Sequence, residues 1–363
     1  MSKRHAVDRE ILRLVEAFQK AGGRLVDLPV LQPADTLLDL YGEDIRSRAY
    51  TTRDPVDGEL MLRPDFTVPV VQMHMTSGAT PARYAYCGKV FRTQELNSDR
   101  PPEYDQVGFE IFDADDPAAA DAEVFVLLSS VLPSGSVRAS TGDIGILMAA
   151  VKALFTSPER KAALMRHIWR PSRFRALLDR YSGRAQMSEA RAALLERARR
   201  GEDLLADAGP VVGLRRPDEI RARLAVLSAD AEAPPISTAE TDLLDVIVTL
   251  KTSASDALAR LREVAQDMPG ISAAVARFEK RLDALSFRGV DTSALEFQGG
   301  YGRATMEYYD GFVFGFTSTG SPDLPPIATG GRYDALVKFL GGGASIPAVG
   351  GVVRPALSVA LAP

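Results

Sequence analysis

The sequence of 363 residues has few of the side chains that hold metals or cross-link secreted proteins. It contains one cysteine, Cys87, and three histidines, His5, His74 and His167, which lie far apart. A single cysteine forms no internal disulfide, which fits a reducing compartment, and scattered histidines supply no group of soft metal ligands. We therefore expect a cytoplasmic protein with no metal site.

Excess charge of one sign and long apolar runs are also missing. The net charge is −5, whereas nucleic-acid-binding domains usually carry an excess of basic residues, so general nucleic-acid binding is disfavoured. No run of about 18 apolar residues is present to span a membrane. The N-terminal residues 1–18 mix charged and apolar side chains at helical spacing, which predicts an amphipathic helix and not a signal peptide.

The most informative segment is residues 83–112, RYAYCGKVFRTQELNSDRPPEYDQVGFEIF. Aromatic and β-branched residues in its first and last thirds predict two strands, and the polar middle, ending in Pro101-Pro102, predicts a long loop. Three residues recur at period two on the second strand and therefore share one face: Gln106, Gly108 and Glu110. Because buried polar groups need partners and glycine leaves room, this face is expected to receive a small polar ligand; the alternative is a hairpin with a solvated charged face.

This segment is similar to the second signature motif of class II aminoacyl-tRNA synthetases, in the histidyl branch. Three further segments resemble motifs of the same branch, in the same order. They are LRPDFT (62–67), similar to LRPEGT; MEYYDGFVFGF (306–316), similar to the LDYY segment; and ATGGRYDALVKFLGG (328–342), similar to AGGRYDGLVEQLGG. The resemblance extends from roughly residue 20 to residue 350.

From about Met148 the sequence changes to helical patterns rich in alanine, arginine, leucine and glutamate. We predict a helical insertion at residues 151–287 between the two parts of a discontinuous core domain, residues 1–150 and 288–363. The resemblance implies that this core is an α/β (α+β) fold, a class II synthetase-like antiparallel sheet flanked by helices. It also implies a homodimer, because residues 26–42 stand where the first class II signature forms a dimer interface.

The resemblance further implies a site for free histidine. The residues at matching positions are Asp65, Thr67, Arg92, Gln106, Glu110, Tyr308 and Tyr309. Asp65, Thr67 and Gln106 would surround the α-ammonium group. Asp65 replaces the usual glutamate of the family, which keeps the charge on a shorter side chain. Its alternative role is that of a helix N-cap.

At the other end of the ligand, Glu110 would accept from the imidazole N–H and the Tyr308 hydroxyl would pair with the second ring nitrogen. Arg92 would lie on the carboxylate or phosphate side, and Tyr309 would support the wall. The alternative is that these polar groups form an internal network that satisfies itself without a ligand.

The sequence also departs from the synthetase motifs. Thr93 and Gln94 replace the histidine and glutamate of the second motif, Ala304 replaces an arginine, with Arg303 displaced by one residue, and the third motif has lost its Glu-Arg pair. The residues at the last two positions are Ala356 and Leu357. Each loss removes charge that adenylate formation needs. The C-terminal anticodon-binding domain is also expected to be absent, so tRNA is not an expected partner.

A synthetase-like core that holds histidine without activating it resembles the regulatory subunits of short-form ATP phosphoribosyltransferase, the first enzyme of histidine biosynthesis. This resemblance implies a chain without catalytic activity or cofactor, which assembles with a shorter catalytic subunit and supports feedback by histidine. Three alternatives are a truncated class II synthetase-like enzyme that activates an amino acid with ATP, a sensor of tRNA-like RNA, and a structural scaffold with a vestigial site.

Overall fold

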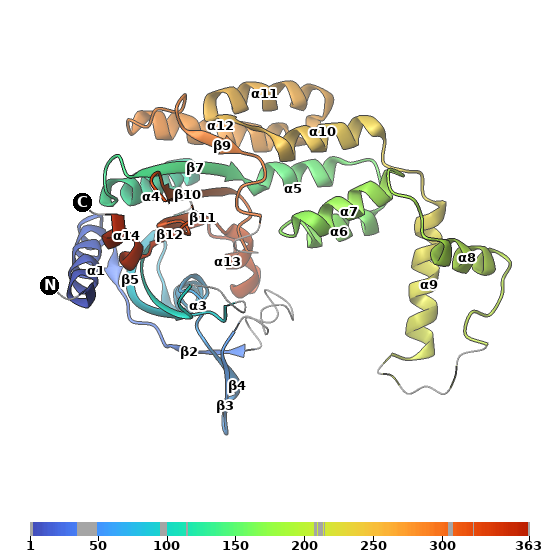
Figure 1. The fold of residues 1–363 in the computed structure, drawn as a ribbon, viewed down its shortest axis with the longest axis horizontal. Helices are drawn as coiled ribbons and strands as arrows, with labels where there is room; N and C mark the ends of the chain where they lie inside the picture. Colours follow the sequence, from blue (N-terminus) through green and yellow to red (C-terminus); the bar gives the residue numbers. More distant parts are fainter. Residues whose placement is uncertain are drawn as a thin grey trace.

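The computed structural model describes residues 3–34, 49–94, 100–113, 115–206, 209, 213, 215–303, 308–321 and 323–361. Its main sheet has nine strands and lies at one side of the molecule, with a helical part extending from it (Figure 1). In spatial order its strands are β1 (Arg24–Leu25), β5 (Ala82–Phe91), β6 (Glu103–Phe112), β12 (Ala348–Val353), β11 (Ala328–Arg332), β10 (Phe312–Ser318), β7 (Val137–Asp143), β9 (Glu296–Gln298) and β8 (Lys251–Ser253). Neighbouring strands are antiparallel except β1 with β5 and β7 with β9. The predicted antiparallel sheet flanked by helices is therefore confirmed.

One face of the sheet is apolar and is covered by α4 (Pro117–Val131). Phe312, Phe314 and Phe316 alternate along β10 and point to this face, where Phe125 of α4 lies 6.3, 5.4 and 5.2 Å from them between ring centroids. All four side chains are buried. Period-two alternation thus fixes which face of β10 meets the helix, and the opposite face is left for other groups.

The opposite face is rich in glycine, and polar side chains occupy the space. Gly108 lies opposite Tyr86 on β5, and a Cβ at Gly108 would lie 2.2 Å from the Tyr86 ring. Gly350 lies opposite Glu110 in the β12–β6 register. The expectation that Gly108 leaves room for a ligand is therefore wrong, because the Tyr86 ring from the neighbouring strand fills that room.

Gly350→Ala is expected to lower the free energy of unfolding by about 1–3 kcal/mol, as overpacking does. A Cβ at this position would lie 1.3 Å from Glu110 Oε2 and 2.9 Å from the Phe109 carbonyl oxygen, so the carboxylate must move. Gly320→Ala is the control, since no atom lies within 4 Å of a Cβ there. Chemical denaturation compares the two variants, and equal stabilities would contradict this packing.

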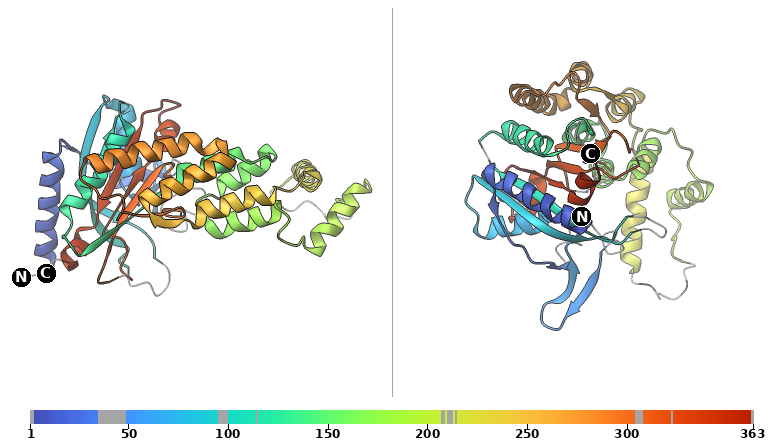
Figure 2. Two further views of the ribbon diagram at one scale, coloured as in Figure 1. Left: turned by 90° about the horizontal axis from the view of Figure 1, so that it is seen from above. Right: turned by 60° about the vertical axis from the view of Figure 1, so that its left-hand side comes forward.

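The predicted insertion contains mostly helices. Its elements, starting from the helix that enters it, are α5 (Ile144–Ala153), α6 (Pro158–Arg166), α7 (Pro171–Tyr181), α8 (Glu189–Arg199), α9 (Pro217–Glu232), α10 (Thr238–Thr249), β8, α11 (Ala254–Asp267), a 3-10 turn (Pro269–Ile271) and α12 (Ser272–Phe287). Helices α8 and α9 project furthest from the sheet (Figure 2). By contrast, β8 joins the sheet and α12 packs on α4, so the range 151–287 is closely tied to the core. Its status as a separate domain remains a prediction.

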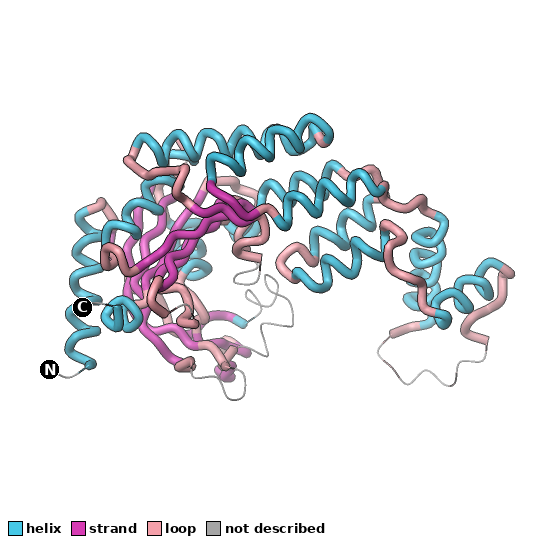
Figure 3. Tube along the Cα trace, turned by 45° about the horizontal axis from the view of Figure 1, so that its top comes forward, coloured by secondary structure: helices cyan, strands magenta, loops and turns pink. Residues whose placement is uncertain are grey.

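The remaining elements lie at the sheet edges and on both faces, with Phe18 of the N-terminal helix packing on Phe109 on the α4 side. They are α1 (Lys3–Lys20), α3 (Thr67–Ser77), α13 (Asp334–Leu340), α14 (Pro355–Leu361) and a small sheet of β2 (Leu31–Pro33), β4 (Gly58–Leu62) and β3 (Thr51–Asp54). Figure 3 shows the strands gathered on one side of the molecule and an all-helical part on the other. Within the described ranges no helix is long and apolar enough to cross a membrane. Of the predicted dimer segment 26–42, residues 35–42 lie outside the described residues.

Candidate functional site

Glu110, on β6, lies at the centre of a polar cluster on the glycine-rich face and is 1% exposed. Its Oε1 accepts hydrogen bonds from the Tyr86 hydroxyl at 2.7 Å and the Thr67 hydroxyl at 3.3 Å. Its Oε2 accepts one from the Tyr333 hydroxyl at 2.7 Å. These three donors are neutral, and none of the ion pairs found within the described ranges includes Glu110. The cluster therefore holds a buried acid whose charge the hydrogen bonds only partly compensate.

Burial raises the pKa of Glu110 to about 7. The hydrogen bonds from Tyr333, Tyr86 and Thr67 work in the other direction, and the nearby charge of Asp65 adds to the increase. At neutral pH the carboxyl group is thus poised between its two forms. It can accept a hydrogen bond from a ligand N–H or donate one to a basic ring nitrogen.

The wild-type protein and the Glu110→Gln variant are expected to differ in how their stability depends on pH. The free energy of unfolding of the wild type, minus that of the variant, should fall by about 3 kcal/mol as pH rises from about 4.5 to about 7. Across this window the folded protein keeps a proton on Glu110 that the unfolded chain has released, so stability decreases with rising pH. Asp310, whose pKa burial also raises to about 7, is present in both proteins and cancels. Denaturant titrations at several pH values measure the difference. Parallel stability curves would show that Glu110 does not titrate in this way.

Asp65, whose charge acts on Glu110, and Gln106, which lies on the same face of β6, are also buried, at 4% and 1% exposure. The Asp65 carboxylate accepts a long hydrogen bond of 3.4 Å from the Val68 N–H, so the N-cap alternative holds only in weak form. The Oε1 atom of Gln106 has no hydrogen-bond partner within the described ranges. A buried, unsatisfied amide oxygen costs about 1–3 kcal/mol, so it favours the arrival of a donor such as an ammonium group.

Two tyrosines close the other side of the cluster. The Tyr308 hydroxyl donates to Thr67 Oγ1 at 3.2 Å, and the rings of Tyr308 and Tyr309 lie 4.8 Å apart. Burial raises the pKa of Tyr309, the charges of Glu110 and Asp65 raise it further, and Arg92 opposes them. The Tyr309 hydroxyl is therefore within electrostatic reach of both acids and of an arginine.

Arg92 is held at the end of β5. Its Nε donates to the Pro64 carbonyl oxygen at 2.8 Å, and its backbone N–H donates to the Pro102 carbonyl at 2.8 Å. Pro64 directly precedes Asp65, so this contact fixes the guanidinium beside the start of α3. The structure thus brings six of the seven residues that the sequence singled out into one cluster, and the seventh, Gln106, lies on the same face of β6, four residues before Glu110. The seven residues come from four separate segments: Asp65 and Thr67, Arg92, Gln106 and Glu110, and Tyr308 and Tyr309.

Sequence reasoning missed two members of the cluster, Tyr86 and Tyr333. Both direct their hydroxyls at Glu110, and burial raises the pKa of each well above its ordinary value. For Tyr333 a signal was available, because it belongs to the segment ATGGRYDALVKFLGG. The register that places Tyr86 directly across from Gly108 comes from the structure alone.

The displaced Arg303 points away from the cluster. It is 3% exposed, its Nε donates to the Ile168 carbonyl at 2.7 Å, and its guanidinium lies 4.7 Å from the Phe174 ring centroid. Burial lowers its pKa to about 10. Arg303 therefore binds the insertion and does not act at the site, and Ala304, where the family has its arginine, lies outside the described residues.

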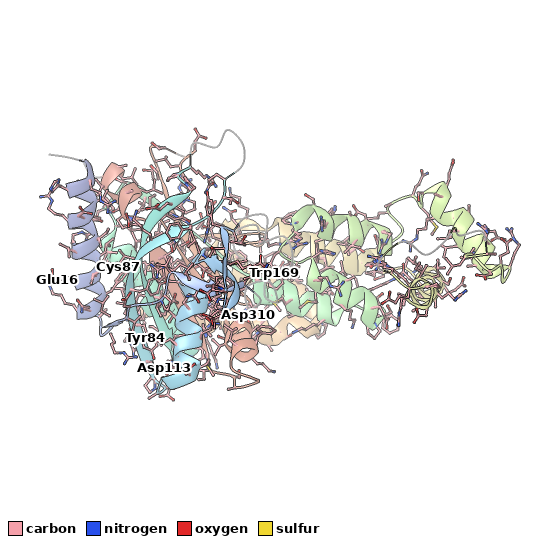
Figure 4. All side chains as sticks on the ribbon, turned by 90° about the horizontal axis from the view of Figure 1, so that it is seen from below. Glu16, Tyr84, Cys87, Asp113, Trp169 and Asp310 are labelled. Carbon is pink, nitrogen blue, oxygen red and sulfur yellow. The ribbon has the colours of Figure 1, made fainter. Side chains whose placement is uncertain are left out.

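The insertion also contacts the site through Trp169. Its Nε1 donates to the Tyr309 carbonyl oxygen at 3.1 Å. Figure 4 labels Trp169 and Asp310 at the junction between the sheet and the helical part. The turn between α6 and α7 thus holds the backbone of a residue that lines the cluster.

Sequence comparison finds two groups of relatives. The family model described as histidyl-tRNA synthetase matches residues 2–233 and 218–356. Proteins named ATP phosphoribosyltransferase regulatory subunit from Brucella canis and Brucella anthropi are each 32% identical over 343 residues, covering 90% of this chain and 90% of theirs.

Solved structures show the same fold. A protein from Bacillus halodurans, described as an ATP phosphoribosyltransferase regulatory subunit/histidyl-tRNA synthetase, superposes with a TM-score of 0.67 at 20% identity, over 99% of this chain and 80% of that one. Histidyl-tRNA synthetase from Nostoc sp. PCC 7120 gives a TM-score of 0.62 at 16% identity, over 99% of this chain and 73% of that one. Identities this low establish the fold alone.

Proposed function

This chain belongs to the family of ATP phosphoribosyltransferase regulatory subunits, which are related to histidyl-tRNA synthetase, and we propose from this a role for it in ATP phosphoribosyltransferase. It is the regulatory and not the catalytic subunit of the enzyme that opens histidine biosynthesis. It assembles with the catalytic subunit, and histidine bound to it lowers the activity of the complex. The cluster around Glu110 is the histidine site.

The buried, unsatisfied Oε1 of Gln106 is the observation that carries this proposal. An α-ammonium group placed between Gln106 and Asp65 supplies the missing donor and a counter-charge for the acid. The Thr67 hydroxyl, whose bonds to Glu110 and Tyr308 are long at 3.3 and 3.2 Å, exchanges them for ligand contacts at small cost.

The imidazole ring suits the opposite end of the cluster. An imidazole has an ordinary pKa near 6.5 and that of Glu110 is about 7, so a proton is shared readily between them at neutral pH. The rings of Tyr308 and Tyr309 give the imidazole aromatic walls. A ligand without a ring nitrogen gives the Glu110 carboxyl group no new hydrogen-bond partner.

Activation of histidine is not part of this proposal. Leu357 in α14 stands where the synthetase motif has arginine, and Arg303 faces the insertion. Adenylate formation needs preorganised positive charge at the phosphates, which these two changes remove. We further propose that the chain forms a homodimer through its synthetase-like core and binds no tRNA.

Reconstitution with the catalytic subunit tests this function. The catalytic subunit alone and an equimolar mixture with this chain are compared for phosphoribosyl-ATP synthesis and for co-elution in size-exclusion chromatography. We expect one complex with higher activity than the catalytic subunit alone. Separate elution together with unchanged activity would overturn the proposal.

A further inference from the structure

The turn that joins α6 to α7, residues 167–170, carries contacts between the helical insertion and the cluster around Glu110. Backbone hydrogen bonds fix the turn from both sides. The Ile168 N–H donates to the Met165 carbonyl of α6 at 3.2 Å, and the Arg170 carbonyl accepts from the Phe174 N–H of α7 at 2.9 Å. The Ile168 side chain is also fully buried. The position of the turn is therefore set by the two helices of the insertion.

Two side-chain hydrogen bonds join this turn to the segment that supplies the tyrosines of the cluster. Trp169 Nε1 donates to the Tyr309 carbonyl at 3.1 Å, and the Ile168 carbonyl accepts from Arg303 Nε at 2.7 Å. Arg303 is buried. One bond has its donor in the insertion and the other has its donor in the core domain. Adjacent residues of the turn thus hold two points of the same core segment.

The backbone at Tyr309 determines where the aromatic walls of the cluster stand. The Tyr309 ring lies over β11, where a Cβ at Gly331 would come within 2.7 Å of its Cδ1. The Tyr308 ring lies 4.8 Å from the Tyr309 ring and 6.1 Å from the Tyr333 ring, between centroids. In packing this close, the rings cannot keep these contacts if the backbone that carries them moves.

The insertion and the core domain hold different parts of this backbone. After Tyr309, the Asp310 N–H donates to the Arg332 carbonyl at 3.1 Å, and the Gly311 carbonyl accepts from the Ile144 N–H at 2.9 Å. At Tyr309 itself the carbonyl accepts from the indole of Trp169. A buried carbonyl needs such a partner. The insertion therefore supplies a contact at the residue that lines the cluster, and the core domain supplies the contacts that follow it.

We infer that Trp169 is a positioning residue of the histidine site: its indole N–H holds the Tyr309 backbone where the ligand needs it, so the insertion contributes to histidine affinity. The inference rests on the proposed histidine site and adds a residue that lies outside it. Walls placed before the ligand arrives reduce the ordering cost of binding. If fewer chains have the walls in place, the apparent dissociation constant rises in proportion. Histidine bound against Tyr309 in turn changes the surroundings of the indole.

Calorimetric titration of L-histidine into the wild-type chain and Trp169→Phe tests the inference. Phenylalanine keeps an aromatic ring and lacks the N–H, so binding should weaken about 3- to 10-fold, which corresponds to one hydrogen bond. Trp169 is the single tryptophan of the sequence, so biosynthetic incorporation of its benzothiophene analogue changes this residue alone. The analogue has sulfur in place of the N–H and should give the same loss at nearly unchanged shape.

Asp230→Ala is the matched control within the insertion. Asp230 accepts hydrogen bonds from Arg160 at 2.6 Å and from Arg191 at 2.9 Å, and its loss weakens the insertion without touching the turn at Trp169. Histidine affinity in this variant should change less than about twofold, as for a site without shared partners. Circular dichroism confirms that each variant is folded.

Fluorescence of the wild-type chain tests the same inference without a substitution, because all tryptophan emission comes from Trp169. We expect histidine to change the emission saturably, with the midpoint that calorimetry gives. Three outcomes overturn the inference alone: unchanged affinity in the benzothiophene protein, an equal loss in Asp230→Ala, or constant emission while calorimetry shows binding. An equal loss in Asp230→Ala would mean that the stability of the insertion, and not the contact at Tyr309, sets the affinity. If the wild-type chain binds no histidine, the proposed site fails as well.

Discussion

Glu110→Ala is expected to weaken histidine binding to the isolated chain by about 30-fold or more. The substitution removes the acceptor for the imidazole and leaves the hydroxyls of Tyr86 and Tyr333 without the carboxylate that now receives them at 2.7 Å each. Loss of one partner from a buried, charged hydrogen-bonding set costs roughly 2–5 kcal/mol, which corresponds to this change in affinity. Isothermal titration calorimetry at neutral pH measures it.

Two further variants serve as a second test and as a control. Asp65→Ala should weaken binding through the ammonium end of the ligand. Glu103→Ala, on the same strand but at an exposed position paired with Lys89, should leave affinity unchanged. If neither Glu110→Ala nor Asp65→Ala changes the affinity, histidine binds elsewhere and the cluster is an internal network that satisfies itself.

Arg281→Met is expected to produce the largest loss of stability, about 3–5 kcal/mol in the free energy of unfolding. Arg281 of α12 is 4% exposed and donates at 2.7 Å both to Asp121 of α4 and to Asp143 at the end of β7. Arg332 shares Asp121, with contacts of 2.6 and 3.0 Å. Removal of the central cation leaves Asp143 buried without its ion-pair partner.

The matched control is Arg262→Met, on the neighbouring helix α11. Arg262 pairs with Glu279 at 2.5 Å, but the two side chains are 54% and 41% exposed, so the expected loss is below about 1 kcal/mol. The double variant Arg281→Met, Asp143→Asn should recover part of the stability, because the second buried charge is also gone. Equal losses in Arg281→Met and Arg262→Met would contradict the account of the buried network.

The parts of the fold that local sequence patterns determine were predictable. Alternation in residues 83–112 gave the strands β5 and β6 and placed Gln106 and Glu110 on one face, as the structure confirms. Helical spacing gave the run of helices after residue 157. Both patterns depend on neighbours in the chain, which a single sequence contains.

Contacts between distant segments were not predictable in the same way. Tyr86 fills the space over Gly108 only because two strands pair in one register, and Tyr333 reaches Glu110 across 223 residues of sequence. The short strand β8 lies inside a helical range and forms because the edge of β9 is available to it.

The most direct test of the central claim is a histidine titration of the assembled enzyme, with phosphoribosyl-ATP synthesis as the readout. Complexes containing the wild-type chain and Glu110→Gln are compared at equal concentrations. The account predicts that both chains support activity without histidine, that histidine inhibits the wild-type complex, and that the Glu110→Gln complex needs at least about tenfold more histidine for the same inhibition. Identical inhibition curves would show that histidine acts at another site, and the account would be wrong.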